Sequence, residues 1–276
     1  MEQTFNLQRC AHLFANHWAE NKKRYLLSIA AYIGLAFVWF IFIMVTDGYD
    51  PLAQGLQQIT FLFSAIALGP FFASQFFSEL GSKSKATNYL MVPASTFEKL
   101  LCSLFYVMVL FPIVLFTAFY IVDILAVLVA NASHDSYNVA NEKGVIIKAT
   151  VANVFHTERG MNNDALYYCT LMFFALQSAA LLGSVYFTQY SYIKTAISLV
   201  LIFLFVAWLE HYWISSIMPR GHFANSITKF WIWGEKEHQI VQLPEWIGTV
   251  LEITLFYGTT LILWTVTYFR LKEKEV

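Results

Sequence analysis

The residue types that most often carry chemistry are dispersed along this chain of 276 residues. Its seven histidines and three cysteines form no compact pattern. Three signatures are absent: the G-x-x-x-x-G-K-[ST] loop that wraps nucleotide phosphates, the H-E-x-x-H zinc pair, and the G-x-S-x-G turn of serine hydrolases. We therefore predict no catalytic residue, no metal site, no cofactor and no ATP hydrolysis by this chain alone.

Three acidic residues interrupt apolar stretches, where a charge is costly and usually faces protein or water. Asp123 and Glu210 lie near the predicted outer ends of their stretches, so we expect water to reach them. Glu252 lies about two helical turns inside its stretch. It is either a structural residue, neutral or paired with a neighbouring helix, or a group that faces an aqueous path.

A line of mostly polar residues marks one face of residues 56–77. Its members recur at steps of three, four or seven residues: Gln57, Thr60, Ser64, Phe71, Gln75 and Ser78. Such spacing places them on one side of a helix, which in a bilayer either packs on protein or lines a conduit. The candidate translocation path consists of Gln57, Thr60, Ser64, Gln75 and Glu252, with helix packing as the alternative.

The elements that would position the polar line and the acidic residues are long apolar helices in a bilayer. The chain is 58% hydrophobic and 13% charged, against roughly 25% charged residues in average soluble domains. A helix crosses the hydrocarbon core with about 20 uncharged residues. Six stretches meet or nearly meet this requirement: residues 25–46, 56–77, 100–122, 165–190, 192–213 and 246–269. We predict an all-α polytopic membrane protein with six transmembrane helices.

The distribution of Lys and Arg predicts the orientation of the spans. With six spans both termini share one side, and most of the seventeen Lys and Arg residues fall on that side. Basic residues are retained in the cytoplasm. We therefore predict a multi-pass protein of the cell (inner) membrane with both termini cytoplasmic, Lys83 and Lys85 inside, and Lys143 and Lys236 outside.

The segments that flank the spans have patterns of their own. Within residues 5–20, Leu7, Cys10, Phe14 and Trp18 recur at helical spacing, so residues 1–24 are predicted to form a cytoplasmic, interfacial helix before a transmembrane domain of residues 25–276.

Outer loops are predicted at residues 131–164 and 211–245. In the first loop, residues 144–155 are rich in β-branched side chains, which favours a strand or hairpin. The second contains two short apolar clusters, residues 213–218 and 230–233, for which we expect re-entrant or interfacial helices.

A polar connection, residues 78–98, separates the second and third spans. Ser95 and Glu98 fit the capping box, in which each side chain accepts a hydrogen bond from the backbone amide of the other residue, and Pro93 discourages helix upstream. The third span is therefore predicted to begin here. Residues 82–89 are short, basic and polar, and are suited to presenting a cytoplasmic feature to a partner.

The N-terminal interfacial helix, the six spans, the polar connection and the long loop before span six together resemble the permease subunit of ABC-2-type transporters. The stretch FFSELGSKSKATNYLMVPASTFEKLL is similar to one in a bacterial branch of this family. The resemblance implies the type V exporter-like architecture. It also implies a separate ABC ATPase subunit that docks on the connection, and a second permease subunit in a homo- or heterodimer. The implied ATPase-coupling residues are Ser82, Lys83, Ser84, Lys85 and Tyr89.

The expected function is thus that of the membrane-spanning subunit of an ATP-driven exporter, with the lipid bilayer and the ATPase as partners and no nucleic acid. Two alternatives differ in class. One is a membrane-embedded enzyme that uses Glu252 and outer-loop histidines. The other is a non-transporting membrane scaffold or assembly factor, which predicts no continuous polar path.

Overall fold

The computed structural model describes residues 5–46, 52–81, 91–134, 149–155, 163–187, 189–217, 222–226, 229–233, 238–242, 244, 246–247, 250 and 253–275. Its long helices are α1 (Leu7–Thr46), α2 (Gln54–Phe76), α4 (Thr96–Leu104), α5 (Phe111–His134), α6 (Asn163–Tyr186), α7 (Ser191–Ile217) and α9 (Thr259–Glu275). A 3-10 turn η1 (Ser78–Gly81) follows α2, a π-helical stretch η2 (Phe105–Leu110) joins α4 to α5, and another, η3 (Ile253–Gly258), precedes α9.

Five described helical segments are long and apolar enough to cross a bilayer: Leu7–Thr46, Gln54–Phe76, Thr96–Ala132, Ala165–Tyr186 and Ser191–Leu209. They correspond to the first five predicted spans, in agreement with a helical, multi-pass membrane protein. The sixth predicted span, residues 246–269, falls partly outside the described residues, and its described part forms η3 and the beginning of α9. A sixth crossing stays a prediction.

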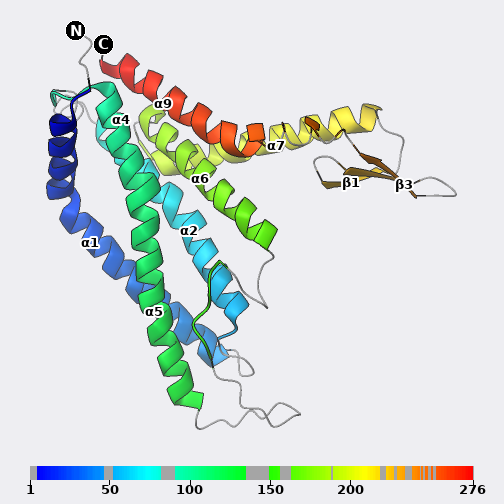
Figure 1. Ribbon diagram of the computed structural model, residues 1–276, viewed down its shortest axis with the longest axis horizontal. Coiled ribbons are helices and arrows are strands. Elements are labelled where there is room, and N and C mark those ends of the chain that lie inside the picture. Colours follow the sequence, from blue (N-terminus) through cyan, green and yellow to red (C-terminus); the bar gives the residue numbers. More distant parts are fainter. Residues whose placement is uncertain are drawn as a thin grey trace.

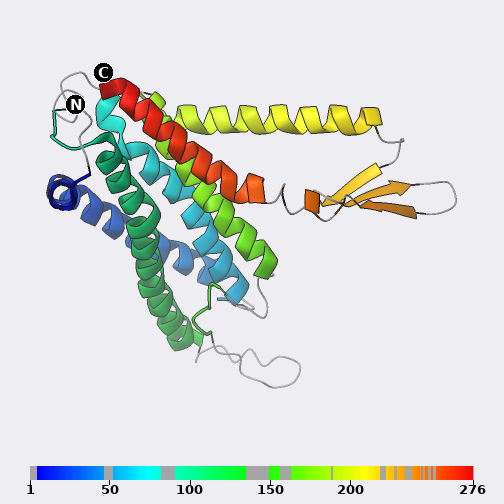
Figure 2. The same cartoon turned by 45° about the horizontal axis from the view of Figure 1, so that its top comes forward.

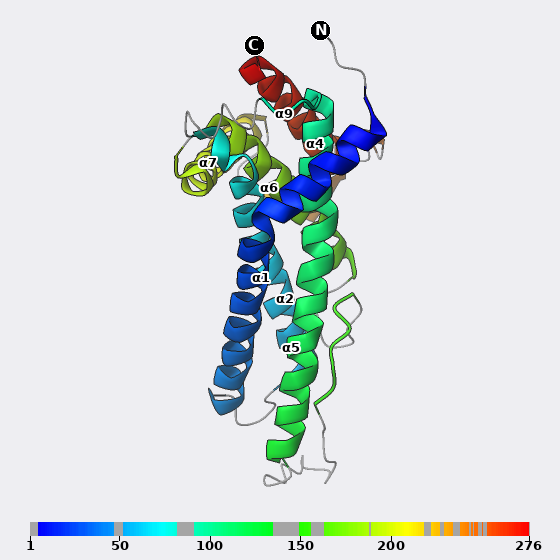
Figure 3. The same ribbon diagram turned by 90° about the vertical axis from the view of Figure 1, so that its left-hand side faces the viewer.

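The helix α1 is continuous over 40 residues and includes both the predicted N-terminal helix and the first span. Its first part is turned at an angle to the rest and crosses the beginning of α4 (Figure 3). The predicted boundary at residue 24 therefore lies within one helix. This bend brings the N-terminal residues of α1 against the third span.

The helices α1, α2, α5, α6 and α9 form an elongated bundle (Figure 1). The first described residues of α1, the beginning of α4 and the end of α9 lie at one end of it, which we call the terminal end. The end of α1, the beginning of α2 and the end of α5 lie at the opposite, far end. The assignment of both termini to one side of a membrane, and of that side to the cytoplasm, stays a prediction.

Two glycines allow the helices around α6 to approach closely. A Cβ atom added at Gly69 of α2 would lie 2.7 Å from the Phe173 ring on α6, and one at Gly183 of α6 would lie 1.9 Å from Thr195 Oγ1 on α7. Real Cβ atoms do not make contacts this short, because the interior of a protein is close-packed. These glycines fix where α2, α6 and α7 touch.

The helix α7 leaves the bundle and carries a small sheet beyond its end (Figure 2). The strands β1 (His222–Ser226), β2 (Lys229–Trp233) and β3 (His238–Gln242) pair antiparallel in the order β1-β2-β3.

The expectation of a re-entrant or interfacial helix at residues 230–233 is wrong, since these residues form β2. Their aromatic and β-branched side chains favour a strand, and β2 is paired on both edges. Residues 213–217 continue α7 and form no separate helix. The regular structure described outside these three short strands is helical, in agreement with a helical membrane protein.

Candidate functional site

The residues predicted to contact an ATPase, Ser82, Lys83, Ser84, Lys85 and Tyr89, lie outside the described residues, and so does Glu252. Their positions stay predictions. The structure does describe the elements on both sides of the predicted docking segment: the end of α2 with η1 before it, and residues 91–95 with the beginning of α4 after it. The candidate site described below therefore consists of these flanking elements.

The predicted capping box at the beginning of α4 is confirmed. The Glu98 amide donates to Ser95 Oγ (3.2 Å), and the Ser95 amide donates to Glu98 Oε2 (2.8 Å). This reciprocal pair satisfies two backbone donors that have no partner within the helix. The third span therefore begins at a fixed point directly after the polar connection.

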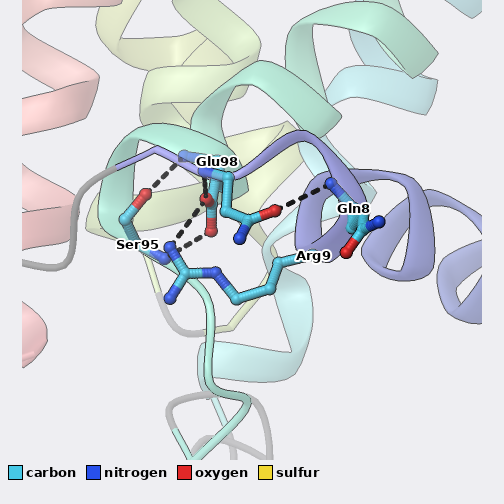
Figure 4. A network of polar contacts seen from close by, with 5 residues as sticks. Gln8, Arg9, Ser95 and Glu98 are labelled. Carbon is cyan, nitrogen blue, oxygen red and sulfur yellow. Dashed lines mark hydrogen bonds and ion pairs between the residues drawn. The ribbon is translucent and has the colours of Figure 1, made fainter.

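Glu98 also binds the beginning of α1. Its Oε1 atom accepts hydrogen bonds from the Asn6 amide (2.8 Å) and from the Arg9 guanidinium (3.1 Å). Figure 4 shows Arg9 and Ser95 converging on Glu98 from the two elements. The Glu98 side chain is 0% exposed, whereas that of Arg9 is 34% exposed. We call Asn6, Arg9, Ser95 and Glu98 the Glu98 clasp.

A buried carboxylate is tolerated only when it is paired and hydrogen-bonded. In the Glu98 clasp both carboxylate oxygens accept hydrogen bonds, and one of the donors is a cation. The clasp therefore joins the first helix to the third span without leaving an uncompensated charge.

Aromatic side chains extend this junction to α2. The His17 ring of α1 stacks on Phe76 at the end of α2, with the ring centroids 4.5 Å apart, and meets Tyr106 of η2 edge-on at 4.6 Å. The Tyr106 hydroxyl donates to the Phe14 carbonyl (3.0 Å). Both ends of the predicted docking segment are thus attached to the first part of α1.

The predicted polar line of α2 is divided among several roles. The Thr60 and Ser64 hydroxyls donate to the carbonyls of Leu56 and Thr60 in their own helix, each at 2.8 Å. Trp39 of α1 also donates to Thr60 Oγ1 (3.3 Å). Gln75 is half-buried near the terminal end of the helix. A translocation path along these residues stays a prediction.

Gln57 is fully buried and binds the backbone of residues 149–155, which we call the strap. Its Nε2 atom donates to the carbonyls of Leu52 (2.9 Å) and Thr150 (3.1 Å), and its Oε1 atom accepts from the Ala152 amide (2.8 Å). Gln58 Nε2 donates to the Val154 carbonyl (2.9 Å). For Gln57 this geometry favours the packing alternative over the conduit.

The helix α5 holds the strap from the other side. The Tyr120 hydroxyl donates to the Ala152 carbonyl (3.1 Å) and accepts from the Val154 amide (3.3 Å), and Asn131 makes a reciprocal pair with the backbone of Ala149 (both 3.0 Å). In the strap, Ala152 and Val154 are buried while their neighbours are exposed, as in an extended strand. Side chains of two helices thus replace a neighbouring strand.

The sequence predicted a strand or hairpin at residues 144–155. Residues 144–148 lie outside the described residues, and the strap is extended without a strand partner among the described elements. Sequence reasoning missed the role of the glutamines in holding it. The available signal was the adjacent pair Gln57-Gln58, two long amide side chains near the beginning of a transmembrane helix.

Asp123 of α5 is buried, although the sequence predicted that water would reach it. Its side chain is 0% exposed, and neither carboxylate oxygen has a hydrogen-bond partner within the part of the chain that the structure describes. The expectation is wrong because α5 does not end near Val122 but continues to His134, so that Asp123 lies inside the bundle.

Comparison of the chain with protein-family models, with curated proteins and with solved structures gives no significant match.

Proposed function

We propose that this chain is the membrane-spanning permease subunit of an ATP-driven exporter of the ABC-2 type. A separate ATPase docks on residues 82–89, between the second and third spans, and a second permease subunit completes the translocation path. In this proposal the terminal end of the bundle faces the cytoplasm from the cell (inner) membrane. The resemblance in sequence motivates the proposal, and the Glu98 clasp is the structural observation that supports it best.

The support comes from how the predicted docking segment is attached. A segment transmits the motion of a bound partner only if both of its ends are fixed to the elements that move. On one side Phe76 stacks on His17, and on the other side Glu98 binds Asn6 and Arg9. A partner that moved residues 82–89 would therefore move α1, α2 and α4 together.

The docking proposal is tested by co-purification of the full chain from native membranes. We expect a protein with a phosphate-loop motif to co-purify, and the double variant Lys83→Glu and Lys85→Glu to recover much less of it at equal amounts of inserted permease. The matched control, Lys83→Arg and Lys85→Arg, keeps both charges and should retain the partner. Equal recovery with the Glu variant would refute docking on these lysines, and the absence of any ATPase would refute the proposed class.

A further inference from the structure

Asp123 is a buried ionisable group for which the described residues supply no partner. It lies on the same helix as Tyr120, three residues away, where side chains of one face are neighbours. The Ala152 amide of the strap lies close to the Asp123 carboxyl, but its hydrogen bond goes to Gln57 Oε1, at 2.8 Å. Neither oxygen of Asp123 therefore has a hydrogen bond of its own.

Asp123 lies between apolar neighbours on α5 and the backbone of the strap at Ala152. Its neighbours on α5, Val122 and Ala126, pack with Phe40 of α1 and Val154 of the strap in one apolar cluster. On the strap side, the carbonyls of Thr150 and Ala152 each accept one hydrogen bond from a side chain. A carbonyl oxygen has a second lone pair for a further donor or cation.

The described segments that pack around Asp123 contain no Lys or Arg. The strap, α2 and the part of α1 after Tyr32 contain no Lys, Arg, His, Asp or Glu. The other titratable groups on these elements are the hydroxyls of Tyr32 and Tyr120, and His134 about three helical turns further along α5. Lys148 and His156, which flank the strap, lie outside the described residues.

An ionised carboxylate in such a place is unstable. Removing an unpaired charge from water costs several kcal/mol even after relaxation of the protein. The cost disappears if the carboxyl is neutral, or if a cation is bound beside it. Because Asp123 is the one acidic group in these described segments, a single positive charge compensates it.

We infer that Asp123 and the strap form a binding site for one positive charge, filled by a proton or by a monovalent cation such as sodium or potassium. The bound charge holds the strap against α2 and α5, and the strap in turn keeps water from the carboxylate. The inference concerns the far end of the bundle and does not depend on the proposed function.

The first test compares the full chain with its Asp123→Asn variant, which keeps the shape and removes the charge. Unfolding temperature is measured in lipid nanodiscs between about pH 5 and about pH 9, where an aspartate of the unfolded chain is ionised. The salt is sodium chloride, potassium chloride or N-methyl-D-glucamine chloride at equal ionic strength. The control variant is Glu98→Gln, which removes a buried carboxylate that already has its donors.

The two sources of positive charge give different results. If a proton fills the site, the folded state holds a proton that the unfolded state has lost. The wild-type unfolding temperature then falls relative to that of Asp123→Asn as the pH rises, equally in every salt, because the wild-type unfolding constant increases by up to about tenfold per pH unit. If sodium or potassium fills the site, the difference in unfolding temperature between the wild type and Asp123→Asn grows with pH only in N-methyl-D-glucamine chloride. It disappears when the metal ion is added. A difference that is constant in pH and in salt would overturn the inference.

A second measurement decides the matter if Asp123→Asn fails to fold. Val154 is 1% exposed, so in a chain without the native cysteines a Val154→Cys thiol is protected while the strap is bound. Its labelling rate by a polar thiol reagent should rise at high pH, or on removal of sodium and potassium. Asn153→Cys, on the exposed side of the strap, serves as the control and should react under all conditions. A Val154→Cys rate unaffected by pH and cation would count against the site.

Discussion

The helical run from α4 to α5 carries two fully buried carboxylates in opposite surroundings. At the terminal end, Glu98 accepts hydrogen bonds from Asn6, Arg9 and Ser95. At the far end, Asp123 accepts none from the described residues. Burial alone therefore does not assign a role to an acidic residue in a membrane helix. Glu98 is a structural junction that is complete in itself, whereas no described residue compensates a charge on Asp123.

The largest effect is expected for Glu98→Ala. The substitution removes the acceptor for three donors and leaves Arg9 without its carboxylate, and breaking a buried ion pair typically costs about 3–5 kcal/mol. Arg9 is partly exposed and can be rehydrated, so we expect the lower end of this range, about 3 kcal/mol of unfolding free energy. Denaturation should show the loss, and hydrogen exchange should place it in residues 5–20.

The matched control for this prediction is Glu20→Ala on the same helix. Glu20 is exposed and accepts one hydrogen bond from Asn16, at a distance of 3.0 Å. Such surface pairs contribute about 0–1 kcal/mol. If both alanine variants lost the same stability, the Glu98 clasp would be no stronger than a surface contact, and the contrast with Asp123 would lose its basis.

The two ends of this helical run also differ in how far they could be predicted from the sequence. The capping box was predictable because Ser95 and Glu98 are three residues apart and the motif is local. The contacts of Glu98 with Asn6 and Arg9 were not, since they join residues 92 and 89 positions apart. Hydropathy located the first five spans for the same reason that the capping box was found: each signal is contained in one segment.

At the far end the local signals were misleading. Asp123 follows an apolar stretch that reaches the required span length at about residue 122, so the sequence placed it at the membrane surface. The helix continues for about three more turns because residues 124–130, ILAVLVA, are themselves good helix and membrane formers. The strap that covers this region is held by side chains of α2 and α5, and no pattern within the strap predicts those partners.

The next effect in size is expected for Gln57→Leu, which tests the cover over Asp123. The leucine leaves the carbonyls of Leu52 and Thr150 and the Ala152 amide without their partners, at about 1–3 kcal/mol for each buried unsatisfied group. Because the strap can partly detach and its backbone can regain hydrogen bonds to water, we expect a total loss of about 2 kcal/mol of unfolding free energy. Hydrogen exchange should show faster exchange of the Ala152 and Val154 amides.

Gln54→Leu is the control for the strap. Gln54 donates to the Thr150 hydroxyl (2.9 Å) at an exposed position, where water replaces the lost partner. It should change both stability and exchange little. Slow exchange of the Ala152 amide in Gln57→Leu would mean that apolar packing of Ala152 and Val154 holds the strap, and that the glutamine is dispensable.

A smaller effect is expected for Ser95→Ala, which weakens the Glu98 clasp without removing its charge pair. Loss of the serine oxygen leaves the Glu98 amide without a capping acceptor, which typically costs about 1 kcal/mol. The contacts of Glu98 with Asn6 and Arg9 do not involve the serine side chain.

Denaturation of Ser95→Ala, of Glu98→Ala and of the double variant completes a double-mutant cycle. A loss for Ser95→Ala as large as that for Glu98→Ala would show that the cap, and not the contact with α1, accounts for the stability of this junction.

The smallest loss of stability is expected for Asp123→Asn near neutral pH, and it is most informative when measured beside Glu98→Gln. In Glu98→Gln one carboxylate oxygen becomes an NH₂ group. Either the Ser95 amide or the donors from Asn6 and Arg9 then face another donor, so a loss of about 1.5–3 kcal/mol is expected. Asp123 has no such donors among the described residues, so an amide of the same shape should not lower the unfolding free energy near neutral pH, and should raise it if the wild-type carboxyl holds a proton there. The pair of isosteric variants separates charge from packing, since neither changes the volume of the core appreciably. A loss for Asp123→Asn as large as that for Glu98→Gln would mean that the ionised form of Asp123 is stabilised by partners as strong as those of Glu98, and the two ends of the helix would then be alike.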